Sequence, residues 1–271
     1  MSVRHFVGDD AVAATPDHDR GLAYGDGLFE TMRAHDGAVH WWPAHWARLE
    51  RGAHALGFAL PEQARVRREA EALLDGANGV LKLIVTRGAG GRGYAPPQAT
   101  PPHWVLSIHD APPASPAEGL TLRWCDTRLA LQPALAGIKH CNRLEQVLAR
   151  AEWSNPGIHE GLVRSTEGDV VSATAANLFV LHGDRWTTPA VDRCGIAGVC
   201  REWAIGALQA REARLAVTEV EAADAVFLCN AARGILPVAR LGARVWGPHP
   251  QVAQLRRRLA AEHPAFVTEV A

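Results

Sequence analysis

Only two of the 28 lysine and arginine residues in this 271-residue sequence are lysines, Lys82 and Lys139. Arginine stays protonated at working pH, whereas a lysine in a suitable pocket can lose its proton and act as a nucleophile or base. A high-GC coding bias would explain the scarcity of lysine, but it does not explain the pattern that follows Lys139. Lys139 is therefore the candidate reactive residue.

The residues after Lys139 resemble the start of a helix. Asn142 is suited to the N-cap, and Glu145 stands where a capping-box partner would be. The apolar residues that follow are spaced to form one helical face: Leu144, Val147, Leu148 and Ala151. We expect Lys139 to lie just before this helix, where the helix-end amides would lower its pKa.

Two glycine-rich segments could contact phosphate. Gly195 to Gly198 forms a glycine turn leading directly into a helix that starts at Val199, a shape suited to anion binding, although an ordinary turn would have the same pattern. Gly88 to Gly93 fits the dinucleotide fingerprint G-x-G-x-x-G, but prolines follow where the required helix should begin. We therefore exclude a dinucleotide site at the second segment.

Composition narrows the class of protein. The net charge of −1 suggests no nucleic-acid or anionic-membrane partner. The five cysteines contain no Cys-x-x-Cys pair, which favours reduced thiols and a cytoplasmic location. No apolar run reaches the roughly 20 residues that a membrane span needs, and the 13 histidines show no zinc-ligand spacing. We expect no membrane segment and no metal site.

The elements expected around these residues indicate an α/β (α+β) protein with an N-terminal domain, 1–112, and a C-terminal domain, 117–271, that carries Lys139. We expect the site between the two domains, where pockets are often found. The strands expected from alternation and β-branched content are 38–42, 80–86, 104–109, 120–125, 161–164, 177–182, 185–188 and 225–229. The helices expected besides the one after Asn142 are 44–56, 62–74, 199–210 and 251–262.

Seven motifs in one order resemble the superfamily of branched-chain and D-amino-acid aminotransferases, and most closely its lyase branch, the aminodeoxychorismate lyases. The motifs are Tyr24-Gly-Asp-Gly-Leu-Phe-Glu30, His45-Trp-Ala-Arg48-Leu49, Arg87-Gly-Ala-Gly-Gly-Arg92-Gly-Tyr94, Lys139 to Leu148, Ala175-Ala-Asn177-Leu-Phe179, Gly195-Ile-Ala-Gly198-Val-Cys-Arg201 and Cys229-Asn230-Ala231. The resemblance implies a two-domain, fold type IV homodimer that uses pyridoxal 5'-phosphate.

By resemblance, Lys139 holds the cofactor covalently and is the catalytic residue. The phosphate would be bound by Arg48, by the amides of Val199 and Cys200, and by a second turn at Asn230 and Ala231. Arg92 and Tyr94 would bind a substrate carboxylate. Two of these roles have simple alternatives, since Arg48 could be a solvated helix residue and the loop with Arg92 a flexible hairpin tip.

Ser172 departs from the aminotransferase pattern, which has a glutamate five residues before Asn177 to keep the pyridine nitrogen of the cofactor protonated. A hydroxyl can hydrogen-bond that nitrogen but cannot hold a proton on it as a carboxylate does. The weaker electron sink favours a lyase whose product becomes aromatic, unless Glu167 or Asp169 takes over the role.

We therefore expect a lyase that converts 4-amino-4-deoxychorismate to 4-aminobenzoate and pyruvate. The alternatives are a branched-chain or D-amino-acid aminotransferase, and a cofactor-binding protein without turnover.

Overall fold

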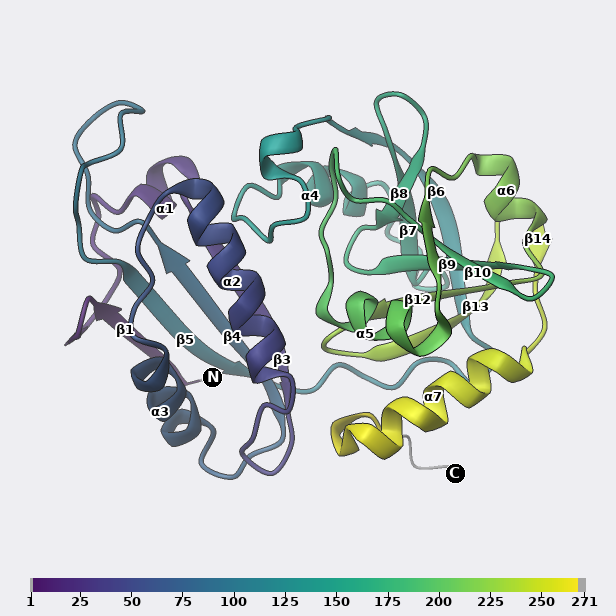
Figure 1. The fold of residues 1–271 in the computed structure, drawn as a ribbon, viewed down its shortest axis with the longest axis horizontal. Helices are drawn as coiled ribbons and strands as arrows, with labels where there is room; N and C mark the ends of the chain where they lie inside the picture. Colours follow the sequence, from purple (N-terminus) through teal and green to yellow (C-terminus); the bar gives the residue numbers. More distant parts are fainter. Residues whose placement is uncertain (1, 268–271) are drawn as a thin grey trace. The chain divides into compact units, whose positions relative to one another are not determined.

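The computed structural model describes residues 2–267. The chain divides into two compact units, Met1–Pro112 with Ile138–Asn142, and Pro113–Gly137 with Arg143–Ala271 (Figure 1). We expected the C-terminal domain to carry Lys139. Instead, the short segment Ile138–Asn142 belongs to the first unit, because its backbone pairs with a strand of that unit.

The first unit is built on a five-stranded antiparallel sheet in the order β2-β1-β5-β4-β3. The strands are β1 (Val3–Val7), β2 (Asp10–Val12), β3 (Gly27–Ala34), β4 (Gly79–Thr86) and β5 (His103–His109). The helices are α1 (Arg20–Tyr24), α2 (Trp42–Leu56) and α3 (Gln63–Leu74).

Helix α2 packs closely against β3 (Figure 1). Gly52 makes this approach possible, since a Cβ there would lie 2.7 Å from the Leu28 side chain. Alternate residues of β3 are buried on that side: Leu28, Glu30, Met32 and Ala34. Glu30 is thus a carboxylate at a position that the strand period assigns to the core.

The second unit contains a nine-stranded mixed sheet in the order β11-β10-β9-β12-β13-β6-β7-β8, with β14 paired to β13. The strands are β6 (Leu120–Leu129), β7 (Glu160–Ser165), β8 (Val170–Ala173), β9 (Asn177–His182), β10 (Arg185–Pro189), β11 (Arg211–Ala213), β12 (Ala225–Asn230), β13 (Gly234–Leu241) and β14 (Arg244–Val245). The helices are α4 (Leu144–Arg150), α5 (Val199–Leu208), α6 (Val217–Ala222) and α7 (Pro250–Glu262). Single 3-10 turns are found at Pro133–Leu135 and Pro264–Phe266.

Most elements expected from local pattern are confirmed within a few residues, including the β9–β10 hairpin, in which Arg185 pairs with His182. The strand expected at 38–42 is wrong. Asp36 and Gly37 adopt positive φ values of 48° and 73°, and the chain turns there and then enters α2. The apolar run was therefore a turn and a helix start.

The capping pair expected for the helix after Asn142 is also wrong. Helix α4 begins at Leu144 with Arg143 at its N-cap and no side-chain cap. The Asn142 amide donates to the carbonyl oxygen of Gly25, and Glu145 accepts from the amide of Ala130. Both side chains are thus used in longer-range contacts, and the predicted effect of the helix start on the pKa of Lys139 stays a prediction.

The expected apolar face of α4 does not enter the core. Leu144, Val147 and Leu148 are 76%, 60% and 61% exposed, and Ala149 is the buried residue of this helix.

Candidate active site

Lys139 lies beside β3. Its carbonyl oxygen accepts from the amide of Phe29 at 3.0 Å, and the amide of Cys141 donates to the carbonyl oxygen of Gly27 at 2.8 Å. The Lys139 Nζ atom lies 4.1 Å from the centre of the Phe29 ring, within the range of a cation–π contact. The backbone pairing of Lys139 with β3 thereby determines the position of its Nζ atom.

The second lysine is a neighbour of the first. Lys82, on β4, places its Nζ 5.8 Å from the centre of the same Phe29 ring. The sequence separates the two lysines by more than fifty residues, but the fold brings both to one aromatic side chain. A chemical test for the reactive lysine must therefore distinguish these two positions.

A buried charged cluster joins β3 to α2. The Glu30 carboxylate accepts from His45 Nδ1 at 2.6 Å, from Arg48 Nε at 2.8 Å and from Arg48 Nη2. Glu30, His45 and Arg48 are only 1%, 2% and 5% exposed. Arg48 is thus a core residue, and its alternative as a solvated helix residue is wrong.

The electrostatics of this cluster favour an ionised pair. Burial raises the pKa of Glu30, but the charge of Arg48 and the hydrogen bond from His45 outweigh burial and lower it to about 2. Burial lowers the pKa of His45, against the opposing effect of Glu30. Glu30 holds Arg48 by two of its three guanidinium nitrogens, which orients the guanidinium plane. Sequence reasoning missed this role for Glu30 and His45, although both residues stand in the motifs quoted above.

The glycine turn before α5 has a geometry suited to an anion. Gly198 is the N-cap of α5 and no side chain caps the helix, so the first amides, those of Val199 and Cys200 among them, have no partner within the helix. Asn177 Nδ2 donates to the carbonyl oxygen of Ile196 at 2.9 Å, and a Cβ on Gly198 would lie 2.2 Å from Asn177 Oδ1. Asn177 thus holds the turn at a spacing that only glycine permits. Oriented amides at a helix start fit a phosphate group.

The chain just before Lys139 touches this turn. Gly137 donates to the carbonyl oxygen of Gly195 at 3.0 Å and accepts from the amide of Ala197 at 3.0 Å. Both hydrogen bonds lie within the second unit, to which Gly137 belongs.

The second predicted phosphate turn adjoins the first. Helix α5 contacts β12, and both burial and a hydrogen bond with Cys229 raise the pKa of the Cys200 thiol. Asn230 Oδ1 accepts from the amides of Ala232 at 3.1 Å and Arg233 at 2.8 Å. The Asn230 side chain therefore stabilises its own turn, next to the buried Ala231.

Ser172 donates its hydroxyl to the carbonyl oxygen of Ala173 at 2.9 Å, so it would have to rotate to donate to a ring nitrogen. Of the two nearby carboxylates, Glu167 pairs with Arg193, and Asp169 lies 3.9 Å from Arg214. Sequence reasoning did not consider Glu160, which accepts a hydrogen bond from Thr174, two residues after Ser172.

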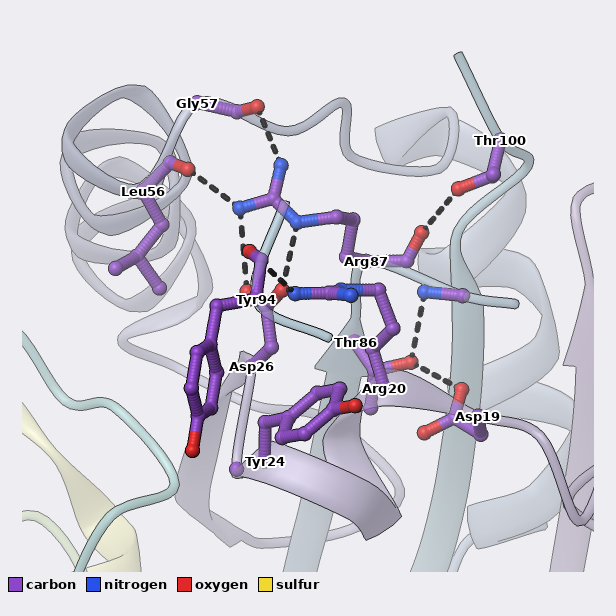
Figure 2. A network of polar contacts seen from close by, with 12 residues as sticks. Asp19, Arg20, Tyr24, Asp26, Leu56, Gly57, Thr86, Arg87, Tyr94 and Thr100 are labelled. Carbon is purple, nitrogen blue, oxygen red and sulfur yellow. Dashed lines mark hydrogen bonds and ion pairs between the residues drawn. The ribbon is translucent and has the colours of Figure 1, made fainter. Parts of the chain in front are cut away.

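Arg92 and Tyr94 lie in the loop between β4 and β5, and Tyr94 is 86% exposed. The alternative of a flexible hairpin tip is not tested, but Figure 2 shows contacts to this loop from the buried side chains of Arg20 and Thr86 and from Thr100. In residues 2–267 no group of histidine, cysteine, aspartate and glutamate side chains is arranged to hold a metal ion. None of the helices in these residues is long and apolar enough to cross a membrane.

Comparison with known proteins identifies the family. The family description "Amino-transferase class IV" matches residues 27–241. The chain is 34% identical to aminodeoxychorismate lyase of Vibrio harveyi, over 89% of this chain and 92% of the relative. The crystal structure of 4-amino-4-deoxychorismate lyase from Pseudomonas aeruginosa is 41% identical with a TM-score of 0.88, covering 96% of this chain and 99% of that chain. A D-alanine aminotransferase of Listeria monocytogenes is 26% identical, over 93% of this chain and 89% of the relative. This chain belongs to the class IV aminotransferase family.

Proposed function

We propose that the protein is a pyridoxal phosphate-dependent lyase that converts 4-amino-4-deoxychorismate to 4-aminobenzoate and pyruvate. The observation that carries this proposal is the 41% identity to a 4-amino-4-deoxychorismate lyase over nearly the whole of both chains. The aminotransferase relative is less similar, at 26%. The expected two-domain α/β fold is that of solved class IV enzymes.

When bound, the cofactor would supply an electron sink for the carbon next to the substrate nitrogen. We propose Lys139 as the amine that holds it. With the cofactor and the substrate bound, the Lys139 amine would take the ring proton. Cleavage of the C–O bond to the enolpyruvyl group would then make the ring aromatic, and the departing enolate would take up one proton to become pyruvate.

Each of the two units supplies donors of the kind that a phosphate dianion needs. The proposed set is the Arg48 guanidinium of the first unit, oriented by Glu30, and, in the second unit, the amides of Val199 and Cys200 with the neighbouring turn at Asn230 and Ala231. A buried cation and unpaired helix-start amides are the groups that lower the cost of desolvating a phosphate. Arg92 and Tyr94 are proposed to bind a substrate carboxylate.

Ser172 supports the lyase over the aminotransferase. Without a carboxylate to protonate the pyridine nitrogen, storage of negative charge in the ring is less favourable, and amino transfer depends on that storage. Formation of an aromatic product supplies its own driving force, so the lyase reaction tolerates the weaker sink.

We further propose a cytoplasmic homodimer. The five cysteines, all of which lie in the described residues, form no disulfide, which fits a reducing compartment. The exposed Leu144, Val147 and Leu148 of α4 form an apolar face, which is the kind of surface that a second subunit covers. That the site lies between the two domains stays a prediction.

The test is to incubate the purified protein with aminodeoxychorismate, and separately with an amino acid and 2-oxoglutarate. The lyase should release 4-aminobenzoate and pyruvate in equal amounts, and a Lys139→Ala variant should release neither. Efficient amino transfer without pyruvate release would favour the aminotransferase. Cofactor binding without either reaction would indicate a binding protein.

A further inference from the structure

Arg20 reaches from α1 into the loop that carries Arg92 and Tyr94. Its Nε atom donates to the Asp26 carboxylate at 2.9 Å. Its Nη1 and Nη2 atoms donate to the carbonyl oxygens of Gly93 and Tyr94, each at 3.2 Å. Arg20 is only 4% exposed, although the loop residues that it binds are exposed. One buried guanidinium thus holds the tip of an exposed loop by two backbone contacts.

Tyr24 adds to this attachment. The Arg20 guanidinium carbon lies 4.8 Å from the centre of the Tyr24 ring, and the Tyr24 hydroxyl accepts from the amide of Gly93 at 3.0 Å. The Tyr24 and Tyr94 rings meet edge to face at 5.5 Å. Figure 2 shows both tyrosines beside Arg20.

The ends of the loop are tied separately. The amide of Gly88 donates to Thr86 Oγ1 at 3.1 Å, and Thr100 Oγ1 donates to the carbonyl oxygen of Arg87 at 2.6 Å. These bonds close the base of the loop near β4, whereas Arg20 and Tyr24 hold its tip. The position of the tip therefore depends on α1.

The charge of Arg20 can be removed without leaving an unpaired carboxylate. Asp26 also accepts from Arg87 Nε at 2.7 Å and Nη2 at 3.2 Å. Arg87 in turn donates to the carbonyl oxygens of Leu56 and Gly57 at the end of α2, each at 2.7 Å (Figure 2). Because Arg87 keeps Asp26 ionised and paired, loss of Arg20 should leave the fold intact.

We propose that Arg20 is a positioning residue that fixes the loop Gly88–Pro101 and so sets Arg92 and Tyr94 for the substrate carboxylate. The role of Arg92 and Tyr94 in substrate binding rests on the proposed function. The attachment of the loop to Arg20 does not. Arg20 uses the three nitrogens of its planar guanidinium group for three partners, which a lysine cannot reproduce.

Two pairs of variants test the inference. Arg20→Met removes the donors, and Arg20→Lys keeps the charge but not the forked geometry. A Cβ on Gly90 would lie 2.6 Å from Arg20 Cδ, so Gly90→Ala displaces Arg20 without altering it. Gly91→Ala is the matched control, because a Cβ there would meet nothing within 4 Å.

The first measurement needs no turnover. Trypsin can cut the exposed Arg92–Gly93 bond, and mass spectrometry of the native holoenzyme gives the rate of that cut. Losing two charge-assisted contacts should raise the rate about ten- to a hundredfold in Arg20→Met, Arg20→Lys and Gly90→Ala. Gly91→Ala should match the wild type. An unchanged rate in Arg20→Met would overturn the attachment.

The second measurement separates positioning from general damage. KM for aminodeoxychorismate should rise about tenfold or more in Arg20→Met, with kcat, bound cofactor and melting temperature nearly unchanged. A fall in cofactor content or melting temperature with unchanged KM would assign Arg20 a purely structural role. Absence of lyase turnover in the wild type would refute the proposed function and leave the cleavage rates to decide the attachment.

Discussion

Arg48→Met should destabilise the cofactor-free protein as well as weaken cofactor binding. In the variant, Glu30, which is 1% exposed in the structure, keeps the hydrogen bond from His45 but loses those that Arg48 Nε and Nη2 donate. Breaking a buried ion pair by removing one partner costs roughly 3–5 kcal/mol. The net lowering of the Glu30 pKa from 4.5 to about 2, to which both Arg48 and His45 contribute, means that the fold favours the ionised carboxylate by about 3 kcal/mol, which is of the same order. We expect a loss near the lower end of that range, about 3 kcal/mol.

The assay is urea unfolding of the cofactor-free variants, followed by circular dichroism. Arg51→Met is the matched control, because Arg51 is an exposed arginine on the same helix, and its effect should stay within about 0.5 kcal/mol. Adding Glu30→Gln to Arg48→Met removes the stranded charge, so the double variant should recover at least about 1 kcal/mol relative to Arg48→Met.

The pH dependence follows from the direction of the pKa shift. Because the folded-state pKa of Glu30 is depressed, its stabilisation is present above about pH 4.5 and is lost as the pH falls towards 2. The difference between wild type and Arg48→Met should shrink over the same interval. Equal stability of Arg48→Met and wild type at pH 7 would refute the reasoning. So would a difference that does not change between pH 7 and pH 3.

Three further predictions concern the cofactor. Borohydride reduction and peptide mapping should place the pyridoxyl group on Lys139, and finding it on the neighbouring Lys82 would exclude the proposed role. Ser172→Glu should raise amino transfer to 2-oxoglutarate relative to pyruvate release, measured as the ratio of the two products; an unchanged ratio would argue against contact between residue 172 and the pyridine ring. Gly198→Ala should lower cofactor affinity by about tenfold or more, since the new Cβ would lie 2.2 Å from Asn177 Oδ1. Gly206→Ala, on the same helix with no atom within 4 Å of the new Cβ, should bind cofactor like the wild type, and equal affinity in both alanine variants would remove the α5 turn from the site.

Local chemistry in the sequence was enough to predict many elements. Gly183-Asp184 between two apolar runs predicted the β9–β10 hairpin, because a two-residue turn with a positive φ at Gly183 joins the strands. Gly198 before Val199 likewise predicted the start of α5, because the residues that mark a helix start lie within a few positions of it in the sequence. The order of the seven motifs indicated the family, and the comparisons with known proteins then established it.

The sequence could not predict which side chains meet across long separations. Asn142 had the residue type of an N-cap, but its amide binds Gly25, 117 residues away. Arg48 had the residue type of a solvated helix position, but it is buried against Glu30 on β3, because a buried carboxylate requires a cation. Local pattern determined where helices and strands form, whereas the partners of Arg48, Lys139 and Arg20 were decided only when the sheet of the first unit brought distant segments together.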